Sequence, residues 1–405
     1  MMYAAYGTQA NILDIVRPLA AAAGTTMRLP WPLLQPDESV RKLAASLETF
    51  ATLAVTHVRP EFGIKSVNVG NRLAPVTEEI VTSTPFANLL HFKKEVDAPQ
   101  PKVLVVAPMS GHFATLLRAT VTTILADHDV YVTDWRNVRD IPGSEGRFDL
   151  SAFVNHIIKF VRVMGPQTHL VAVCQPCVPV LAAAALMAED QDEAQPRSMT
   201  LMAGPIDTRA NPTKVNELAT SKPISWFEQK LTAKVPFGYA GKGRYVYPGF
   251  VQLAAFMSMN LERHVRAFKD MAAARADGDM DKLKTMHSFY EEYLAVMDLP
   301  AEFYLECVKT VFQDHFLPLG KLEVDGRKVN PAAIKRTALL TVEGERDDIC
   351  GLGQTLAAQD LCSGLKQFMK SHHVQTGVGH YGVFSGRRWN SEIYPKVRDM
   401  IQMTN

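Results

Sequence analysis

The sequence has few cysteines, no excess of either charge and no long apolar run. Its five cysteines are an odd and sparse set in 405 residues, which argues against a disulfide framework and favours a reducing compartment. Lys and Arg number 43 against 42 for Asp and Glu, so the composition gives no electrostatic case for nucleic acid binding. The absence of an apolar run of about 18 residues excludes a membrane-spanning helix. The start of the chain has no basic residue before Arg17, unlike a signal peptide. We therefore expect a cytoplasmic protein.

The remaining composition is that of a globular protein, with 47% apolar and 21% charged residues. Short β-branched runs alternate with helical patterns over much of the chain. The predicted strands cover residues 103–107, 129–133, 169–173, 199–203, 337–342 and 370–374. The predicted helices cover residues 38–57, 113–126, 148–163, 180–188 and 354–361. Such alternation predicts an α/β fold with a mostly parallel central sheet and helices on both faces.

This alternation is interrupted between residues 206 and 330, where aromatic residues and Met are frequent. A helical insertion in an α/β sheet is best interpreted as a cap. We therefore expect four parts, with boundaries that follow the changes in pattern. These are an N-terminal segment packing on the core (1–100), the first half of the core (101–205), the cap (206–330) and the second half of the core (331–405).

One segment places a nucleophile directly after a strand. In Leu170-Val-Ala-Val-Cys174-Gln-Pro-Cys177, a strand runs into Cys174 and a helix follows. This is the setting of a nucleophile elbow, with Cys in the usual place of Ser and with Ala172 and Pro176 in the usual places of Gly. The N-terminus of the helix would favour a thiolate at Cys174, which is the reactive form. Two other interpretations stay open for these residues alone: a C-x-x-C redox pair and two buried cysteines without chemistry.

Two later segments favour the elbow. Asp347 follows the strand of residues 337–342 and a glycine turn, and Asp348 is its possible replacement. His380 stands among three glycines after the last predicted strand. Nucleophile, acid and His in that order are typical of the α/β-hydrolase fold, whereas a redox pair requires neither partner. We therefore predict that Cys174, Asp347 and His380 are catalytic, with His380 as the base and Asp347 orienting it.

Further candidate residues for an oxyanion hole and for substrate contacts follow from their places after predicted strands and in the cap. An oxyanion hole needs the N–H after the nucleophile, from Gln175, and one from the loop after an early strand, from Met109 first and Ser110 second. His112 on that loop is a candidate substrate contact, with a capping role as the alternative. We also expect the cap to cover Cys174 and to supply aromatic residues to one wall of a substrate groove. The aromatic candidates are Phe237, Tyr239, Tyr245 and Phe250.

Several long segments of the chain resemble the intracellular poly(3-hydroxybutyrate) depolymerases, which degrade a bacterial storage polyester. The segments that carry the resemblance are 59–64, 108–118, 131–137, 171–176, 204–209, 297–304, 343–349 and 379–384. The resemblance implies a Cys-Asp-His apparatus at Cys174, Asp347 and His380. It also implies that the substrate is granule-bound or oligomeric 3-hydroxybutyrate ester. Cys177 departs from the residue expected there, which is a small one other than cysteine.

We therefore expect an α/β-hydrolase with a helical cap that hydrolyses polyester through a thioester acyl-enzyme at the granule surface, without a cofactor or a metal. The only adjacent histidine pair, His372 and His373, lacks accompanying metal ligands. Two alternatives remain. One is a polyhydroxyalkanoate synthase, in which a hydroxyl of the growing chain attacks the acyl-cysteine. The other is a granule-coat protein without catalysis. Whether the chain forms a homo-oligomer is left open by the sequence.

Overall fold

The computed structural model describes residues 2–29, 37–96 and 99–405. Its centre is a nine-stranded sheet in the order β1-β2-β3-β5-β4-β6-β7-β13-β14. The strands are β1 (Ser66–Val69), β2 (Arg72–Ser83), β3 (Ala87–Lys94), β4 (Lys102–Val106), β5 (Asp129–Trp135), β6 (Thr168–Val173), β7 (Ser198–Met202), β13 (Ala338–Gly344) and β14 (Lys370–Gln375). The strands from β5 to β14 run parallel, and β1, β2 and β3 add an antiparallel edge. All six strands predicted from the sequence are present.

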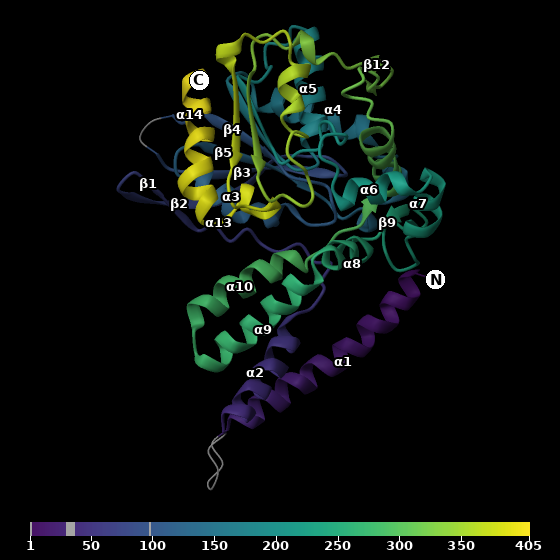
Figure 1. The fold of residues 1–405 in the computed structure, drawn as a ribbon, viewed down its shortest axis with the longest axis vertical. Helices are drawn as coiled ribbons and strands as arrows, with labels where there is room; N and C mark the ends of the chain where they lie inside the picture. Colours follow the sequence, from purple (N-terminus) through teal and green to yellow (C-terminus); the bar gives the residue numbers. More distant parts are fainter. Residues whose placement is uncertain (1, 30–36, 97–98) are drawn as a thin grey trace.

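Helices cover both faces of this sheet (Figure 1). The helix α3 (Arg118–Leu125) contacts α14 (Tyr394–Thr404), and α4 (Leu150–Met164) contacts α5 (Cys177–Glu189). The short helix α12 (Ala357–Leu361) packs on β13. Strands β6, β7 and β13 are buried along their whole length, as is typical of parallel strands covered on both faces. The sheet order and the direction of its strands confirm the α/β-hydrolase fold.

The insertion between β7 and β13 is mostly helical, as expected from the loss of the alternating pattern. Its helices are α6 (Lys214–Ser221), α7 (Ile224–Leu231), α8 (Gly249–Met259), α9 (Leu261–Asp277), α10 (Met280–Tyr293) and α11 (Ala301–Cys307), which continues into a π-helix (Val308–Gln313). It also contains a small antiparallel sheet of β8 (Ala233–Lys234), β9 (Tyr245–Tyr247) and β10 (Leu299–Pro300), and the pair β11 (Glu323–Val324) and β12 (Arg327–Lys328). The sequence pattern did not reveal these short strands.

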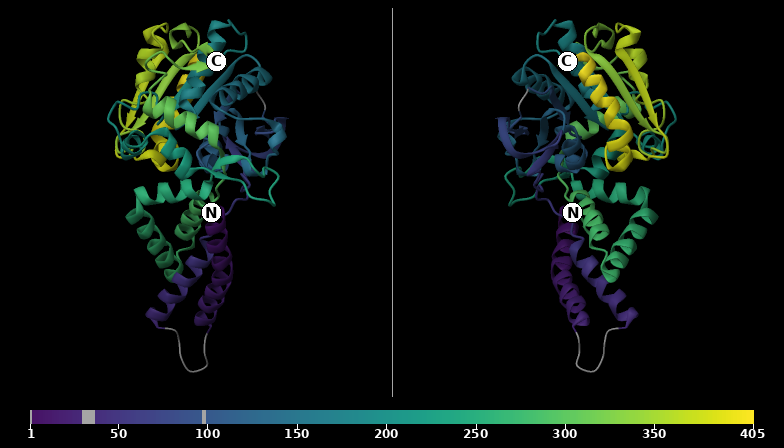
Figure 2. Two further views of the ribbon diagram at one scale, coloured as in Figure 1. Left: turned by 90° about the vertical axis from the view of Figure 1, so that its right-hand side faces the viewer. Right: turned by 90° about the vertical axis from the view of Figure 1, so that its left-hand side faces the viewer.

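The N-terminal segment differs most from expectation. Residues 66–94 do not merely pack on the core, because they form three strands of the main sheet. The preceding helices α1 (Met2–Arg28) and α2 (Glu38–Thr52) form a hairpin, and α2 packs against the cap helix α9. Figure 2 shows this hairpin projecting away from the body that contains the sheet. The pattern of residues 1–100 is mixed, so its division into a helical hairpin and three strands was not apparent from the sequence.

Candidate active site

Cys174 lies in the turn between β6 and α5, in the left-handed region of backbone space with a φ of +66°. A residue other than glycine is rarely found there unless its surroundings enforce it, and such positions cluster at functional sites. The surroundings here are close backbone. The Cys174 N–H donates to the carbonyl of Met202 at 2.8 Å, and a Cβ added to Gly204 would lie 2.3 Å from the Cys177 sulfur. The small residue at 204 therefore lets β7 approach the turn and hold Cys174 in place.

The imidazole of His380 lies between Asp347 and Cys174. Its Nδ1 is 2.8 Å from Oδ2 of Asp347, and Cys174 is close enough to affect its charge. Oδ1 of Asp347 accepts the backbone N–H groups of Ile349 and Cys350, each at 2.9 Å. Both side chains of the acid–histidine pair are almost fully buried. The carboxylate is thus held by its own loop and presents one oxygen to the histidine, as an orienting acid must.

Two opposing effects set the pKa of His380. Burial disfavours the imidazolium, but the adjacent Asp347 and Cys174 outweigh burial and raise the pKa well above its usual value. The surroundings of His380 therefore stabilise its protonated form. Asp348 has another role, because its carboxylate accepts the side-chain amide of Asn260 at the junction of α8 and α9.

The other elbow cysteine is isolated from this group. Cys177 is fully buried in the first turn of α5, and its thiol faces the carbonyls of Ala172 and Met202 at 3.5 and 3.6 Å. Burial raises the pKa of its thiol well above the usual value. All five cysteines are free. Cys177 is therefore placed as a structural side chain, which does not favour the redox interpretation of the C-x-x-C pattern.

The expected oxyanion donors lie beside Cys174. Met109, Ser110 and Gln175 line the same cavity as Cys174. The N–H of Met109 donates to the side-chain Oε1 of Gln175 at 3.3 Å. The Gln175 side chain thus occupies one of the N–H groups that the sequence analysis assigned to the substrate carbonyl.

That cavity has a volume of about 250 Å³ and is predominantly apolar. Its walls come from the cap as well as from the core, as the sequence analysis expected. The cap residues that line it include Phe227 of α7, Tyr247 of β9, Gln252, Phe256 and Met259 of α8, Phe303, Tyr304 and Cys307 of α11, and Phe312 of the π-helix. A partly open apolar cavity with a few polar groups is typical of a ligand site.

None of the four aromatic candidates from the sequence lines this cavity. Phe237 is 91% exposed, Tyr245 is also exposed, and Tyr239 lies over the guanidinium of Arg139. Phe250 stacks on Tyr6 of α1, with ring centroids 4.0 Å apart. The structure therefore does not place these four side chains on the wall of the cavity that contains Cys174. Phe237, Tyr239 and Tyr245 are exposed to solvent. Phe250, at the start of α8, faces α1, whereas Gln252, Phe256 and Met259 of the same helix line the cavity.

His112 is also placed differently from its candidate role. Its Nε2 is 3.1 Å from the backbone carbonyl of Tyr293, and its ring packs on Phe256. Burial lowers the pKa of His112 to about 4, so the ring is neutral near pH 7. The histidine therefore connects the loop after β4 to α10, which corresponds to the structural alternative.

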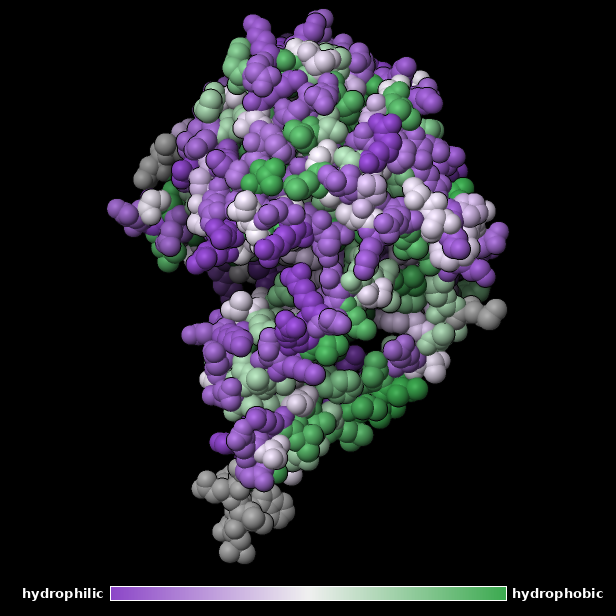
Figure 3. All heavy atoms as spheres, in the orientation of Figure 1, coloured by the Kyte–Doolittle hydropathy of each residue, from purple (hydrophilic) through white to green (hydrophobic). Residues whose placement is uncertain are grey.

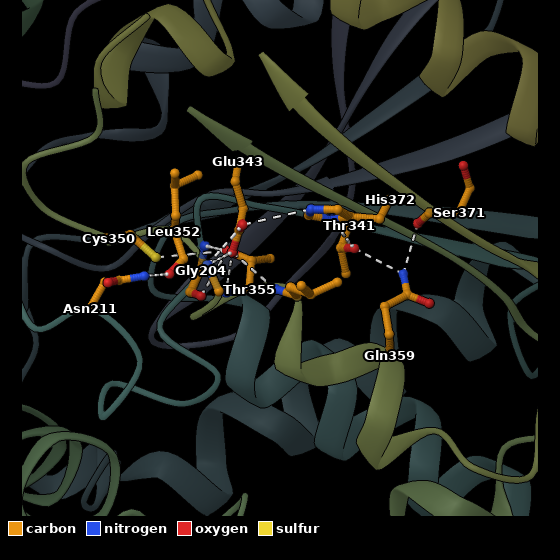
Figure 4. A network of polar contacts seen from close by, with 12 residues as sticks. Gly204, Asn211, Thr341, Glu343, Cys350, Leu352, Thr355, Gln359, Ser371 and His372 are labelled. Atoms are coloured by element: carbon orange, nitrogen blue, oxygen red, sulfur yellow. Dashed lines mark hydrogen bonds and ion pairs between the residues drawn. The ribbon is translucent and has the colours of Figure 1, made fainter. Parts of the chain in front are cut away.

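A second buried carboxylate holds the loop that carries Asp347, and the sequence analysis missed it. Glu343, at the end of β13, accepts backbone N–H groups from Gly353, Thr355 and Leu356 at 2.8 to 3.0 Å (Figure 4). The hydroxyl of Thr355 in turn bonds both the N–H and the carbonyl of Gly204, at 2.8 and 3.0 Å. The network thus joins the acid loop to the backbone that supports Cys174. An acidic residue inside an otherwise apolar strand was the available signal.

Over residues 2–29, 37–96 and 99–405, no cluster of three His, Cys, Asp or Glu side chains could hold a metal ion. Within the same ranges, no helix combines the length and the apolar character needed to cross a membrane.

Comparison with known proteins follows from this geometry. A family model described as PHB de-polymerase C-terminus matches residues 203–405. No curated protein matches the chain. Among solved structures, DcsB in complex with its substrate analogue is 14% identical, with a TM-score of 0.47 over 82% of this chain and 99% of that chain. The 2-hydroxy-6-oxo-6-phenylhexa-2,4-dienoate hydrolase from Rhodococcus sp. strain RHA1 is 12% identical, with a TM-score of 0.44 over 81% of this chain and 99% of that chain. The α/β hydrolase GrgF from Penicillium sp. sh18 is 14% identical, with a TM-score of 0.44 over 82% of this chain and 99% of that chain.

Proposed function

This chain belongs to the PHB depolymerase family, and we propose from that membership that it hydrolyses poly(3-hydroxybutyrate) or its oligomers with Cys174 as the nucleophile. The observation that carries the proposal is the arrangement of Cys174, His380 and Asp347 beside an apolar cavity. A neutral ester with methyl side groups suits such a lining, because burying each methyl group is favourable and no charge has to be matched.

In the proposed first step, His380 takes the proton of Cys174 and the thiolate attacks the ester carbonyl. The carbonyl oxygen becomes an oxyanion, which the N–H groups of Met109 and Gln175 stabilise. Since Oε1 of Gln175 accepts the Met109 N–H at 3.3 Å, this side chain moves aside when substrate binds. The ester C–O bond then breaks, His380 returns the proton to the leaving alkoxide, and a hydroxyl-ended fragment departs. The acyl group remains as a thioester on Cys174.

Water completes the cycle. His380, held through Nδ1 by Asp347, removes a proton from water as it attacks the thioester carbonyl. The C–S bond breaks, the thiolate recovers the proton, and a 3-hydroxybutyrate acid or oligomer is released. We place this activity in the cytoplasm at the surface of polyester granules, where the polymer is the partner of the enzyme. Whether the enzyme acts there as a homo-oligomer is a separate measurement.

The test is to incubate the purified protein with amorphous polymer and to identify soluble products by mass spectrometry. We expect hydroxybutyrate monomers or oligomers, and a thioester adduct on Cys174 in samples quenched with acid. The Cys174→Ala variant is the control and yields neither. Incorporation of hydroxybutyryl-coenzyme A into polymer would instead identify a synthase. Polymer binding without any turnover would identify a coat protein.

A further inference from the structure

Helix α1 has apolar residues on two faces. One face packs on α2, where Gly24 allows close contact: a Cβ there would lie 2.8 Å from the carbonyl of Ala44. The other face is directed outward and carries Ile12, Ile15, Val16 and Leu19, with exposed fractions of 56%, 67%, 41% and 65%. Their spacing of three, one and three residues places them in a single stripe, and Figure 3 shows hydrophobic residues gathered along the exposed side of this helix. We call these four residues the α1 stripe.

The stripe lies on a helix with little charge. Over its 27 residues α1 has only Asp14, Arg17 and Arg28 as charged side chains. Arg28 pairs with Glu48 of α2 at 3.1 Å, and Arg17 lies 3.7 Å from Asp14. Helices that lie on anionic membranes are instead rich in Lys and Arg on their polar side. The charge of α1 therefore favours a neutral apolar occupant over a lipid headgroup region.

The α1 stripe is too small to be the main interface of a stable dimer of this chain. Four side chains expose a few hundred Å² at most, whereas each partner in a stable interface buries about 800 Å². Adsorption to a solid surface does not require the stripe alone to bury such an area, because the surface continues past the end of the stripe. Helix α1 has 27 residues and is therefore about 40 Å long. Figure 1 shows it running as one continuous rod that could lie along such a surface.

The helix is also attached to the wall of the cavity. Tyr3 and Tyr6 pack on Phe250 of α8, with ring centroids 5.6 and 4.0 Å away, and the Tyr3 hydroxyl bonds the carboxylate of Asp298. Gln252 and Phe256, further along α8, line the cavity beside Cys174. A surface bound by α1 is thus directly connected to the cap helix that borders the nucleophile.

We propose that the α1 stripe is the surface by which this protein adsorbs to solid, neutral polyester, which keeps the cap and its cavity close to the polymer. The assignment rests on the proposed function, since it takes the polymer as the occupant. It adds a binding surface that is separate from the cavity and that acts only on insoluble substrate.

The test uses the double variant Ile15→Glu with Leu19→Glu in the full chain. Adsorption is measured by sedimentation with washed amorphous poly(3-hydroxybutyrate) particles, and the folding of the cavity is followed by hydrolysis of p-nitrophenyl butyrate. We expect adsorption to weaken by about tenfold or more, with the rate on the soluble ester retained. The control is Leu319→Glu with Met403→Glu, which places the same charges on exposed apolar residues outside α1 and leaves adsorption intact.

Three results would overturn the assignment. The first is equal adsorption of the wild type and the stripe variant. The second is a wild-type dimer that the stripe variant converts to monomer in light scattering, since the stripe would then be a self-interface. The third is binding to phosphatidylcholine vesicles as tight as binding to polymer. A wild type that adsorbs through the stripe but releases no soluble product would refute the proposed function and leave the adsorption surface in place.

Discussion

Two cysteines three positions apart have different surroundings in this protein. Cys174 borders the cavity and is close enough to His380 to affect its charge, while Cys177 is buried between β6, β7 and Gly204. The difference follows from the turn between them, because α5 begins at Cys177 and rotates its side chain into the core. Reactivity requires the thiolate and access to substrate, and of these two cysteines only Cys174 has a neighbouring histidine and lines the cavity, as the proposed nucleophile must.

Replacing each cysteine by alanine separates these roles. We expect Cys174→Ala to lower ester hydrolysis by at least about 10³-fold, because nothing else can form the acyl-enzyme. Cys177→Ala removes one buried sulfur and should cost about 1 kcal/mol of unfolding free energy with activity largely kept. Rates on a soluble ester and urea unfolding measure the two effects. An inactive Cys177→Ala that still folds would revive the redox interpretation.

Asp347 and Asp348, which follow β13 in the chain, also have different surroundings and should respond differently to substitution. Asp347→Asn should reduce turnover by about 10⁴-fold, as in the serine-protease case where an amide selects the wrong histidine tautomer. The pKa of His380 also falls without its anionic partner. The pH below which the residual activity is lost should therefore be lower than in the wild type. Asp348→Asn removes only a contact with Asn260 and should change the rate by less than about threefold. Equal losses in the two variants would contradict the assignment of the acid.

At the scale of elements, the site depends on how loops are tied to strands. The loop of residues 345–356 carries Asp347 near its start and is held near its end by Glu343. Backbone N–H groups of Gly353, Thr355 and Leu356 converge on that carboxylate as they would on a bound anion. The loop is therefore fixed at both ends by buried carboxylates, one of which orients His380.

Glu343→Gln tests whether this tie positions the acid. The amide keeps the volume but places N–H donors where the backbone also donates, which should cost about 1–3 kcal/mol of stability. We expect kcat to fall by about tenfold with a smaller change in KM, because Asp347 is less well held while Ile349 is the one residue of this loop that lines the cavity. The matched control is Glu323→Gln on exposed β11. A proportional loss of folded protein, with kcat per folded molecule unchanged, would limit Glu343 to a structural role.

The cap offers a second test at this scale. Phe256 of α8 lines the cavity, whereas Phe237 is 91% exposed. Phe256→Ala removes apolar contact area and should raise KM for hydroxybutyrate oligomers by about tenfold, equivalent to about 1.4 kcal/mol of binding. Phe237→Ala should leave both KM and kcat unchanged. The reverse order of effects would mean that substrate follows the outer surface of the cap.

The molecule as a whole contains several histidines buried in neutral form. His112, His128 and His169 are nearly inaccessible, and burial lowers the pKa of each to about 4. The unfolded chain binds protons at these residues near pH 6.5, and the folded chain does so only near pH 4. Between these values the unfolded state holds more protons, so the free energy of unfolding falls as the pH falls.

We therefore expect urea unfolding to show a clear loss of stability between pH 6.5 and pH 5, above the range in which most carboxylates titrate. Each histidine contributes at most about 1.4 kcal/mol per pH unit to the slope. Glutamine cannot be protonated, so the His128→Gln variant should reduce the slope of unfolding free energy against pH by about the contribution of one histidine. A stability profile that is flat over this interval would show that these rings are accessible to protons in the folded state.

The sequence alone determined the alternating strands and helices of the core, the position of the cap and the order of Cys174, Asp347 and His380. These features are encoded locally: buried parallel strands are continuous apolar runs, and functional residues follow them directly at loops. The three residues are far apart in the chain, and the parallel strands β6, β13 and β14 bring their ends to one edge of the sheet. That edge could be anticipated once the strands were identified.

Tertiary structure decided which side chains face the cavity. Helix α8 is apolar on several sides, so its sequence does not distinguish Phe250, which packs on α1, from Phe256, which lines the cavity. The hairpin of α1 and α2, the neutral burial of His112 and the hold of Glu343 on the acid loop likewise depend on partners far away in sequence. The side of a cap helix on which each side chain is buried is set by the packing of neighbouring helices. The hydrophobic pattern of the sequence does not indicate which neighbour each face of the helix will contact.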